Sequence, residues 1–412
     1  MSSLKIRGAW GGSAEAGSTR ESVAAYAERL ANLGINAIFI GLKEGDGRIC
    51  WPSEQFAAIV KPEYRDFDLP AVMQEEFSKR GIECHAWFID YFEGEQGVAF
   101  TQHPEWAATN SKGQTTAEEV LRGSRFGCVW MCPARRPGYT DQWLVPLYEE
   151  FAARYKFASI HHDYIRYPGD MAPDQYCFCD YCLENIPSWA GFINEAFPDE
   201  AFYHESYDRP YLEAHWEQSP RVLPANWAGL GREFKSRFLL EGSFFQTGRA
   251  DLDHFFYEYR MHWITEFARL SHEAMKRVNP SIKKSGAVFK NPIQSGRFIG
   301  QDWRRFTRYM EIAVPMNYRD HFPGTFDQYL GLLAEAIGRQ KVWARECENL
   351  YIGTAINFLF KEENGRTGYP PEKVERVVET IAAAGADGAV LFSTWQFEEF
   401  GVSAAIAKAF GA

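Results

Sequence analysis

The sequence lacks long apolar and long basic runs. It has no stretch near 18 consecutive apolar residues, and its first five residues, Met1 to Lys5, do not form a basic segment followed by an apolar one. Its 44 basic and 55 acidic side chains leave a net charge of −11, without a Lys or Arg run that would attract phosphate backbones or anionic lipid. We therefore expect a cytoplasmic chain that binds neither membranes nor nucleic acids. Self-association into a homo-oligomer stays open.

Several chemical motifs are also absent. There is no glycine-rich phosphate loop with a following Lys and no Gly-x-Ser-x-Gly turn, so the sequence does not support a kinase, a nucleotide-binding protein or a serine hydrolase. We expect no organic cofactor. Eight cysteines in 412 residues are too few for a disulfide scaffold.

Aromatic residues, by contrast, are abundant, with 13 Trp, 20 Tyr and 32 Phe. Most of these rings are expected in the core, because aromatic side chains contribute so much buried area. Flat rings also stack against sugar rings, so the composition is compatible with a carbohydrate partner. A hydrophobic share of 46% and a charged share of 24% are typical of a globular chain with a large core.

Short β-branched or aromatic runs alternate with amphipathic helical stretches along the chain, a pattern typical of parallel strands joined by helices. Eight repeats favour a (β/α)8 barrel, with an open doubly wound sheet as the alternative. The expected strands are Leu4–Trp10, Ile35–Leu42, Ile82–Asp90, Phe157–Asp163, Ile282–Phe289, Ile312–Tyr318, Tyr351–Phe358 and Gly388–Ser393.

The alternation breaks down between about residues 164 and 250, where Pro, Trp, Cys and acidic residues dominate. We interpret this region as an insertion after the fourth strand. The expected organisation is therefore a first half of the barrel in residues 1–163, an insertion in 164–250 and a second half in 251–412.

In a (β/α)8 barrel the active site lies at the C-terminal ends of the strands, so polar and aromatic residues there are functional candidates. Carboxylates and indoles occur together at these positions. Glycoside hydrolysis needs this mixture, because a pair of carboxyl groups acts on the glycosidic bond while aromatic and hydrogen-bonding groups hold the sugar. The candidates for substrate binding are Trp10, Trp87, Asp90, His161, Arg166, Asn317, Tyr318 and Trp395.

Asp163 is the strongest catalytic candidate. Strand periodicity places His161 and Asp163 on one side of the fourth strand and His162 on the other, so the first two are expected at the barrel mouth. Arg166, three residues later, is expected to pair with Asp163 and to hold its pKa low, which suits a nucleophile or a charge stabiliser.

The segment from His161 to Pro168, His-His-Asp-Tyr-Ile-Arg-Tyr-Pro, resembles the His-x-Asp-Tyr-x-Arg-Tyr-Pro signature of the glycoside-hydrolase-like barrel families, the group-10-like hydrolases in particular. Three other stretches resemble the same families: His103-Pro-Glu-Trp106 with Asn110-Ser-Lys-Gly113, Gln301-Asp-Trp303, and Val314-Pro-Met-Asn-Tyr318. The resemblance implies a (β/α)8 barrel in which Asp163 is the catalytic carboxylate.

The signature does not identify the second carboxylate. His162 stands where related families commonly have an aromatic or apolar residue, and strand four does not end in the Asn-Glu pair of the large clan with two catalytic glutamates. Related barrels with a strand-four Asp nucleophile use a strand-six carboxylate, and this resemblance implies Asp320 as the acid/base. Asp90, Asp302 and Glu398 remain alternatives.

Three cysteines crowd into Cys177-Phe-Cys179-Asp-Tyr-Cys182, and a tetrahedral zinc site takes four ligands of this type. The family 42 β-galactosidases show a similar Cys-Pro upstream of such a cluster in a structural zinc site, a resemblance that implies Cys132 as the fourth ligand. Cys128 and His204 are alternatives. Four protein ligands would leave no open position, so we expect a structural Zn²⁺.

The sequence thus predicts a glycoside hydrolase that acts on an oligo- or polysaccharide through Asp163 and Asp320. Two alternatives remain. One is a non-catalytic carbohydrate-binding barrel, and the other is a metal-dependent hydrolase or deacetylase that uses His161, Asp163 and another histidine.

Overall fold

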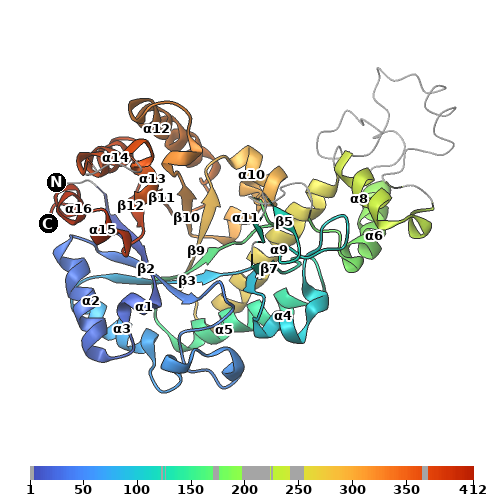
Figure 1. Ribbon diagram of the computed structural model, residues 1–412, viewed down its shortest axis with the longest axis horizontal. Coiled ribbons are helices and arrows are strands. Elements are labelled where there is room, and N and C mark those ends of the chain that lie inside the picture. Colours follow the sequence, from blue (N-terminus) through green and yellow to red (C-terminus); the bar gives the residue numbers. More distant parts are fainter. Residues whose placement is uncertain are drawn as a thin grey trace.

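The computed structural model describes residues 4–121, 124–125, 127–169, 176–196, 223, 226–241, 255–363 and 370–412. Its centre is a closed barrel with the strand order β1-β12-β11-β10-β9-β8-β3-β2, in which every neighbouring pair is parallel. The predicted (β/α)8 barrel is confirmed (Figure 1). The strands are β1 Ile6–Gly11, β2 Ala37–Lys43, β3 Glu83–Ile89, β8 Ser159–Asp163, β9 Lys283–Phe289, β10 Ile312–Met316, β11 Asn349–Ala355 and β12 Gly388–Phe392.

Helices surround this barrel (Figure 1). The main outer helices are α2 Arg20–Asn32, α3 Leu69–Ser78, α5 Val145–Arg154, α9 Phe255–Val278, α10 Pro292–Ile299, α12 Phe326–Trp343, α14 Glu372–Ala383 and α16 Ser403–Phe410. Helices α2 and α3 begin at the N-caps that the sequence predicts. The side chains of Thr19 and Asp68 accept hydrogen bonds from Ser22 N and Ala71 N, as N-caps do.

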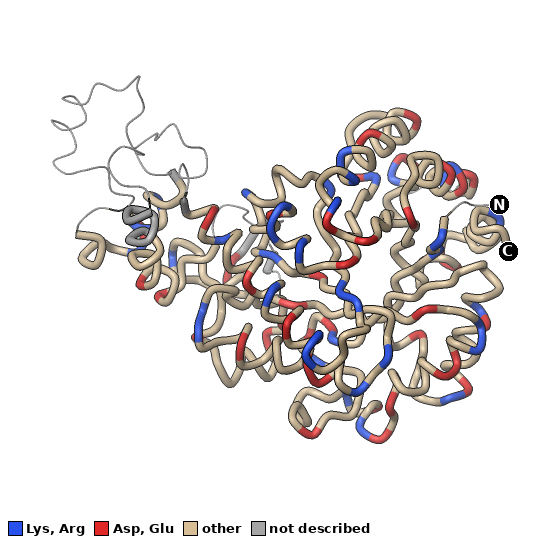
Figure 2. The backbone as a smooth tube through the Cα atoms, turned by 180° about the vertical axis from the view of Figure 1, so that it is seen from behind, with Lys and Arg blue, Asp and Glu red and all other residues tan. Residues whose placement is uncertain are grey.

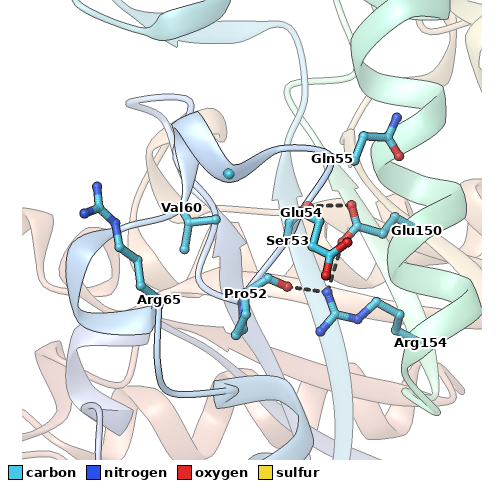
Figure 3. A pocket seen from close by; sticks show the side chains of 9 residues that line it. Pro52, Ser53, Glu54, Gln55, Val60, Arg65, Glu150 and Arg154 are labelled. Atoms are coloured by element: carbon cyan, nitrogen blue, oxygen red, sulfur yellow. Dashed lines mark hydrogen bonds and ion pairs between the residues drawn. The ribbon is translucent and has the colours of Figure 1, made fainter.

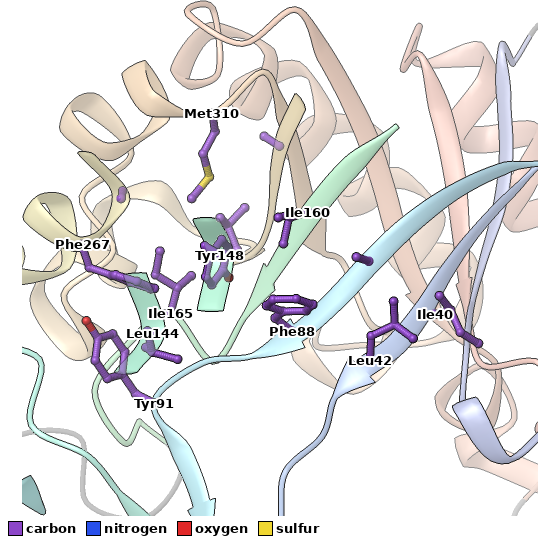
Figure 4. Close-up of a cluster of buried hydrophobic side chains, with 14 of the residues drawn as sticks. Ile40, Leu42, Phe88, Tyr91, Leu144, Tyr148, Ile160, Ile165, Phe267 and Met310 are labelled. Carbon is purple, nitrogen blue, oxygen red and sulfur yellow. The ribbon is translucent and has the colours of Figure 1, made fainter. Parts of the chain in front are cut away.

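The hydrophobic core has two layers, separated by the strands. Ile6, Phe39 and Val314 belong to the cluster inside the barrel. Side chains of opposite parity face the helices, and Figure 4 shows Phe88 and Tyr148 packed in this outer layer. Their ring centroids lie 5.0 Å apart in an edge-to-face arrangement. The period-two alternation of the strands therefore decides which side chains can reach the barrel interior.

Two additions extend the regular barrel. After β3, the short strand β4 Phe92–Gly94 pairs antiparallel with β7 Cys128–Trp130. After β8, the helices α6 Asp180–Ala196 and α8 Arg232–Glu241 lie at the end of the molecule away from the chain termini (Figures 1 and 2). Residues 170–175, 197–222, 224–225 and 242–250 of the expected insertion lie outside the described residues.

The barrel closes where its first and last strands pair, with Trp10 aligned to Phe392. Both ends of the chain therefore lie side by side (Figures 1 and 2). Figure 2 also shows acidic and basic residues interspersed along the backbone. Among the described residues, no helix combines the length and apolar composition that a membrane crossing requires.

A cavity of about 830 Å³ lies on the flank of the barrel, between α5 and the segment that follows β2 (Figure 3). Ser53 Oγ donates to Glu150 Oε2 at 2.7 Å, and Arg154 Nη1 lies 3.0 Å from Glu150 Oε1. Arg154 is the last residue of α5, which leads into the start of β8. The cavity therefore lies away from the C-terminal strand ends where barrel enzymes place their chemistry.

Candidate active site

Strand β8 brings Asp163 to the mouth of the barrel, the ring formed by the C-terminal ends of the eight strands. The alternation along β8 is as predicted: His161 lies inside the barrel, and His162 lies outside it, hydrogen-bonded to Asp90 and Tyr148. Asp163 has the parity of His161 and remains slightly exposed.

Three donors hold the Asp163 carboxylate. Oδ1 accepts from the backbone N–H of Tyr164 at 2.7 Å and from Arg166 Nη1 at 3.3 Å, and Oδ2 accepts from Trp87 Nε1 at 3.2 Å. Burial nevertheless raises the pKa of Asp163 above its ordinary value, against the lowering effects of Arg166, the Tyr164 N–H and Trp87. The expected pairing with Arg166 is present, but the expected low pKa is wrong, because desolvation is the larger effect.

The residue after Asp163 adopts an uncommon backbone conformation. Tyr164 has a φ of 54°, in the left-handed region that few residues other than glycine adopt. This conformation accompanies the turn in which the Tyr164 N–H donates to Asp163 Oδ1. Such conformations cost free energy and persist where the surrounding structure holds them, often at functional sites.

His161 lies in the barrel interior and has both ring nitrogens occupied. Nε2 accepts from Trp10 Nε1 at 3.3 Å, so the neutral ring carries its proton on Nδ1, which faces Ser285 Oγ at 2.9 Å. Burial lowers the pKa of His161 well below its ordinary value, which keeps the ring neutral. The prediction that His161 binds substrate is therefore not supported, and neither nitrogen is free to join Asp163 as a metal ligand.

Aromatic residues form a floor beside Asp163, and we call the set Trp10, Trp87, Tyr318, Phe392 and Trp395 the aromatic floor. Phe392, at the end of β12, contacts the other four rings, with centroid separations from 5.3 Å (Trp395) to 6.2 Å (Trp87). Four of these rings were expected from the strand ends, whereas Phe392 was not. Trp10 is almost fully buried, and Trp395 is 42% exposed, so Trp395 is the ring best placed to meet a substrate.

Asp320 follows β10, in a short helical turn from Arg319 to His321. Its Oδ1 is buried, has no hydrogen-bond partner among the described residues and lies 4.0 Å from His321 Nε2. The charges of both candidate carboxylates act on the side chain of Tyr318. Burial raises the pKa of its phenol, and the charges of Asp163 and Asp320 both raise it further. Both carboxylates thus lie close enough to the Tyr318 hydroxyl for their charges to act on it.

Two predicted substrate-binding residues face away from the mouth. Asp90 is fully buried outside the barrel, where its carboxylate accepts from Tyr148 and pairs with His162 Nδ1 at 2.6 Å. Asn317 is also fully buried and exchanges two hydrogen bonds with Gln340 on α12, at 2.9 and 2.8 Å. A sugar at the mouth cannot reach either side chain, so the assignment of these two residues to substrate binding is wrong.

The other alternative carboxylates have structural partners. Asp302 caps the short helix α11, Trp303–Phe306, and accepts from Arg304 N. Glu398 is mostly exposed and lies 3.7 Å from Arg29. Both carboxylates therefore have structural roles, which leaves Asp320 as the candidate for the second catalytic carboxylate.

The four cysteines Cys132, Cys177, Cys179 and Cys182 form a buried cluster, with all four sulfurs within 4.8 Å of one another. Cys132 follows β7, and the other three precede or begin α6. Cys132 Sγ lies 3.5 Å from Cys182 Sγ and 3.7 Å from Cys179 Sγ. The cluster could hold a metal ion, and Cys128 is not part of it. His204, the other alternative ligand, lies outside the described residues.

Comparisons with known proteins agree with this picture. The model of a family described as glycosyl hydrolase-like 10 matches residues 5–188. No match was found among curated proteins. The solved structures similar to this chain include the glycoside hydrolase domain of PgaB (BpsB) from Bordetella bronchiseptica, with 11% identity, a TM-score of 0.63 and 98% of each chain covered.

Two further structures are similar in fold. The catalytic domain of β-amylase from Paenibacillus polymyxa has 12% identity and a TM-score of 0.57, covering 98% of this chain and 99% of that chain. A β-galactosidase from Rahnella sp. R3 has 12% identity and a TM-score of 0.63, covering all of this chain but 56% of that chain. At such identities the likeness concerns the fold alone. The chain is therefore a (β/α)8 barrel, and its residues 5–188 match the model of the glycosyl hydrolase-like 10 family.

Proposed function

We propose that the protein is a glycoside hydrolase that cleaves an oligo- or polysaccharide, with Asp163 as nucleophile or charge stabiliser and Asp320 as acid/base. The observation that carries the proposal is the setting of Asp163. Its carboxylate is held by three N–H donors at the end of the fourth barrel strand, beside the aromatic floor. The family match and the fold of the neighbouring structures support the same reaction class.

The geometry of Asp163 suits the charge that develops in glycoside hydrolysis. The transition state has oxocarbenium character, and a carboxylate beside it stabilises the positive charge. The donors from Tyr164, Trp87 and Arg166 favour the ionised form and fix its orientation. Because the group is largely buried, its interaction with a developing charge is less screened than it would be in water.

Asp320 has the features that an acid/base requires in this arrangement. Its side chain is partly exposed, so the carboxyl group can exchange a proton with the leaving oxygen, whereas Oδ1 itself is buried without a hydrogen-bond partner among the described residues. It approaches the reaction centre from β10, whereas Asp163 approaches from β8.

The test is hydrolysis by the full-length protein of a panel of 4-nitrophenyl glycosides and of polysaccharides, the latter followed by reducing-end release. The panel includes galactosides, glucosides, fucosides and N-acetylglucosaminides. Asp163→Asn should keep the fold and reduce kcat/KM by about 1,000-fold or more, because loss of a catalytic carboxylate costs several kcal/mol and each 1.36 kcal/mol is tenfold in rate. Asp327→Asn, at a side chain that is 78% exposed, is the matched control.

Two outcomes would contradict the proposal. A rate for Asp163→Asn within about tenfold of the parent would remove Asp163 from the chemistry. Binding of sugars without turnover of any substrate would instead favour a carbohydrate-binding barrel.

We propose further that the four-cysteine cluster holds one structural zinc ion. Zinc is commonly bound by four thiolates in a tetrahedron with Zn–S bonds of about 2.3 Å, which places the sulfurs about 3.8 Å apart. The sulfur separations of 3.5 and 3.7 Å fit this geometry. Four sulfurs would leave no position for water or substrate, so the ion would join β7 to the start of α6 and take no part in the reaction.

A further inference from the structure

A second cavity lies at the mouth, in a region that the sequence did not single out. It has a volume of about 380 Å³ and lies where β9 and β10 end, beside α10. Cavities that bind small molecules commonly measure about 300 to 1,000 Å³. Its walls include Phe289, Lys290, Gln294, Phe298 and His321.

The cavity adjoins the candidate catalytic carboxylates on two sides. The guanidinium of Arg166 lies 5.0 Å from the centroid of the Phe289 ring, and the same group reaches Asp163 Oδ1 at 3.3 Å. On the other side, His321 stacks on Tyr318 with centroids 5.5 Å apart, and its Nε2 lies 4.0 Å from Asp320 Oδ1. A molecule in this cavity would therefore be next to the reaction centre.

His321 presents a hydrogen-bond acceptor at this position. Its Nδ1 faces the carbonyl oxygen of Met316 at 3.1 Å, and a carbonyl can only accept, so the neutral ring carries its proton on Nδ1. Nε2 then keeps its lone pair. A distance of 4.0 Å to Asp320 Oδ1 is too long for a hydrogen bond, so Nε2 is available to a hydroxyl group of a ligand.

The remaining walls favour a neutral sugar over an anion or a wholly apolar molecule. Phe298 is 37% exposed and lies in the cavity wall, where its ring offers a stacking face. The cation in the wall, Lys290, already donates to the carbonyl oxygen of His321 and lies 3.8 Å from the centroid of the Phe322 ring. Gln294 adds an exposed amide. Ring face, amide and lone pair together match the apolar face and the hydroxyl groups of a pyranose.

We propose that this cavity is a subsite for one neutral sugar unit next to the cleaved bond, with Phe298 as its stacking platform and His321 as a hydroxyl acceptor. The inference rests on the proposed glycoside hydrolase function and deepens it. Trp395, the exposed ring of the aromatic floor, follows β12, which is three strands from β9 in the barrel order. A substrate that contacts both Trp395 and Phe298 spans the mouth, so the preferred substrate is a chain of sugars.

The test compares 4-nitrophenyl glycosides of a monosaccharide with those of its disaccharide and trisaccharide, using the sugar series that the full-length protein hydrolyses best. In the parent, kcat/KM should rise with chain length. Phe298→Ala and His321→Phe should each raise KM for the longer substrates by about tenfold, the range of a single aromatic contact, with a smaller effect on kcat. Ile293→Ala, on the same helix at a 71% exposed residue outside the cavity, is the control and should keep the chain-length dependence.

The outcomes separate the subsite from the function. If kcat/KM depends on chain length in the same way in Phe298→Ala and in the parent, the subsite proposal is overturned. The proposed glycoside hydrolase function is then unaffected. If no glycoside is hydrolysed, calorimetric titration with the free trisaccharides decides. Binding to the parent that is lost in Phe298→Ala supports the subsite without the hydrolase, and absence of binding overturns both.

Discussion

At Asp163, two effects of opposite sign act on one carboxyl group. Burial raises its pKa. The guanidinium of Arg166 and two N–H groups lower it, but burial is the larger effect. If ionised Asp163 is required, activity falls as the pH drops through this raised pKa. The acid limb of kcat/KM should therefore lie above the ordinary range of an aspartate.

This reasoning gives a prediction for Arg166. Arg166→Gln removes the charge that lowers the Asp163 pKa, so that pKa rises further and the acid limb of the pH profile of kcat/KM moves to higher pH. Arg166→Lys keeps a positive charge and should move the limb less. An unchanged limb in Arg166→Gln, measured on the same glycoside, would show that another group controls the acid limb.

The role of Asp320 can be tested through the leaving group. If Asp320 protonates the leaving oxygen, Asp320→Asn should slow hydrolysis of unactivated disaccharides by at least about 100-fold, because general acid catalysis contributes in this range. Aryl glycosides with good leaving groups need little protonation and should lose much less. Glu398→Gln, at an exposed ion pair, should leave both rates unchanged. Equal losses on both substrates in Asp320→Asn would contradict this role.

Side-chain parity explains which residues could be placed from the sequence. In β8, residues two apart share a face, and His161 and Asp163 do lie together, opposite His162. The same rule separates Trp87 from Asp90, which is an odd number of positions away and faces the outer helices. It separates Asn317 from the inward Val314 in the same way. The signal for these two corrections was therefore present in the sequence.

The strands were predictable as elements because each is a short and mostly buried run with β-branched or aromatic residues, between helical stretches. The predicted strand of residues 312–318 and β10, Ile312–Met316, begin at the same residue. The helix α10 was not predicted, although Asn291 before Pro292 is a recognisable cap and Gly300 ends the helix in the left-handed conformation. The cavity that α10 borders was therefore also missed, and its shape depends on side chains from several elements that no local pattern brings together.

The cysteine cluster joins two elements, β7 and the start of α6. Cys179→Ser should reduce bound zinc from about one ion per chain to a small fraction and lower the melting temperature, because structural zinc contributes directly to folding. Elemental analysis and thermal unfolding measure both quantities. Cys347→Ser, outside the cluster, should change neither zinc content nor activity. Full zinc content in Cys179→Ser would refute the four-cysteine site.

For the molecule as a whole, eight alternating repeats indicated the barrel before any contact was known, because few architectures accommodate parallel strands joined by helices. The expected boundaries at residues 163 and 250 remain a prediction, since much of the insertion lies outside the described residues. The closed barrel sets the distance between Asp163 on β8 and Asp320 after β10. The pair could therefore be proposed from the strand order, but the distance between the two carboxylates could not be obtained from the sequence.

The pairing of β1 with β12 also has a consequence for how the chain acquires its structure. The first strand can complete its hydrogen bonds only after the last strand is present, and contacts so distant in sequence slow folding. The segment that matches the family model, residues 5–188, holds β1, β2, β3 and β8 and would leave β1 and β8 as open edges prone to aggregation.

A chain cut after residue 188 should therefore be recovered as aggregates, and a cooperative unfolding transition should be seen only for the full chain. Circular dichroism and size-exclusion chromatography test this expectation, and a soluble fragment with a sharp transition would contradict it. On this expectation the family segment is half of one cooperative unit, so a substitution in any of the eight strands should affect the stability of the whole fold.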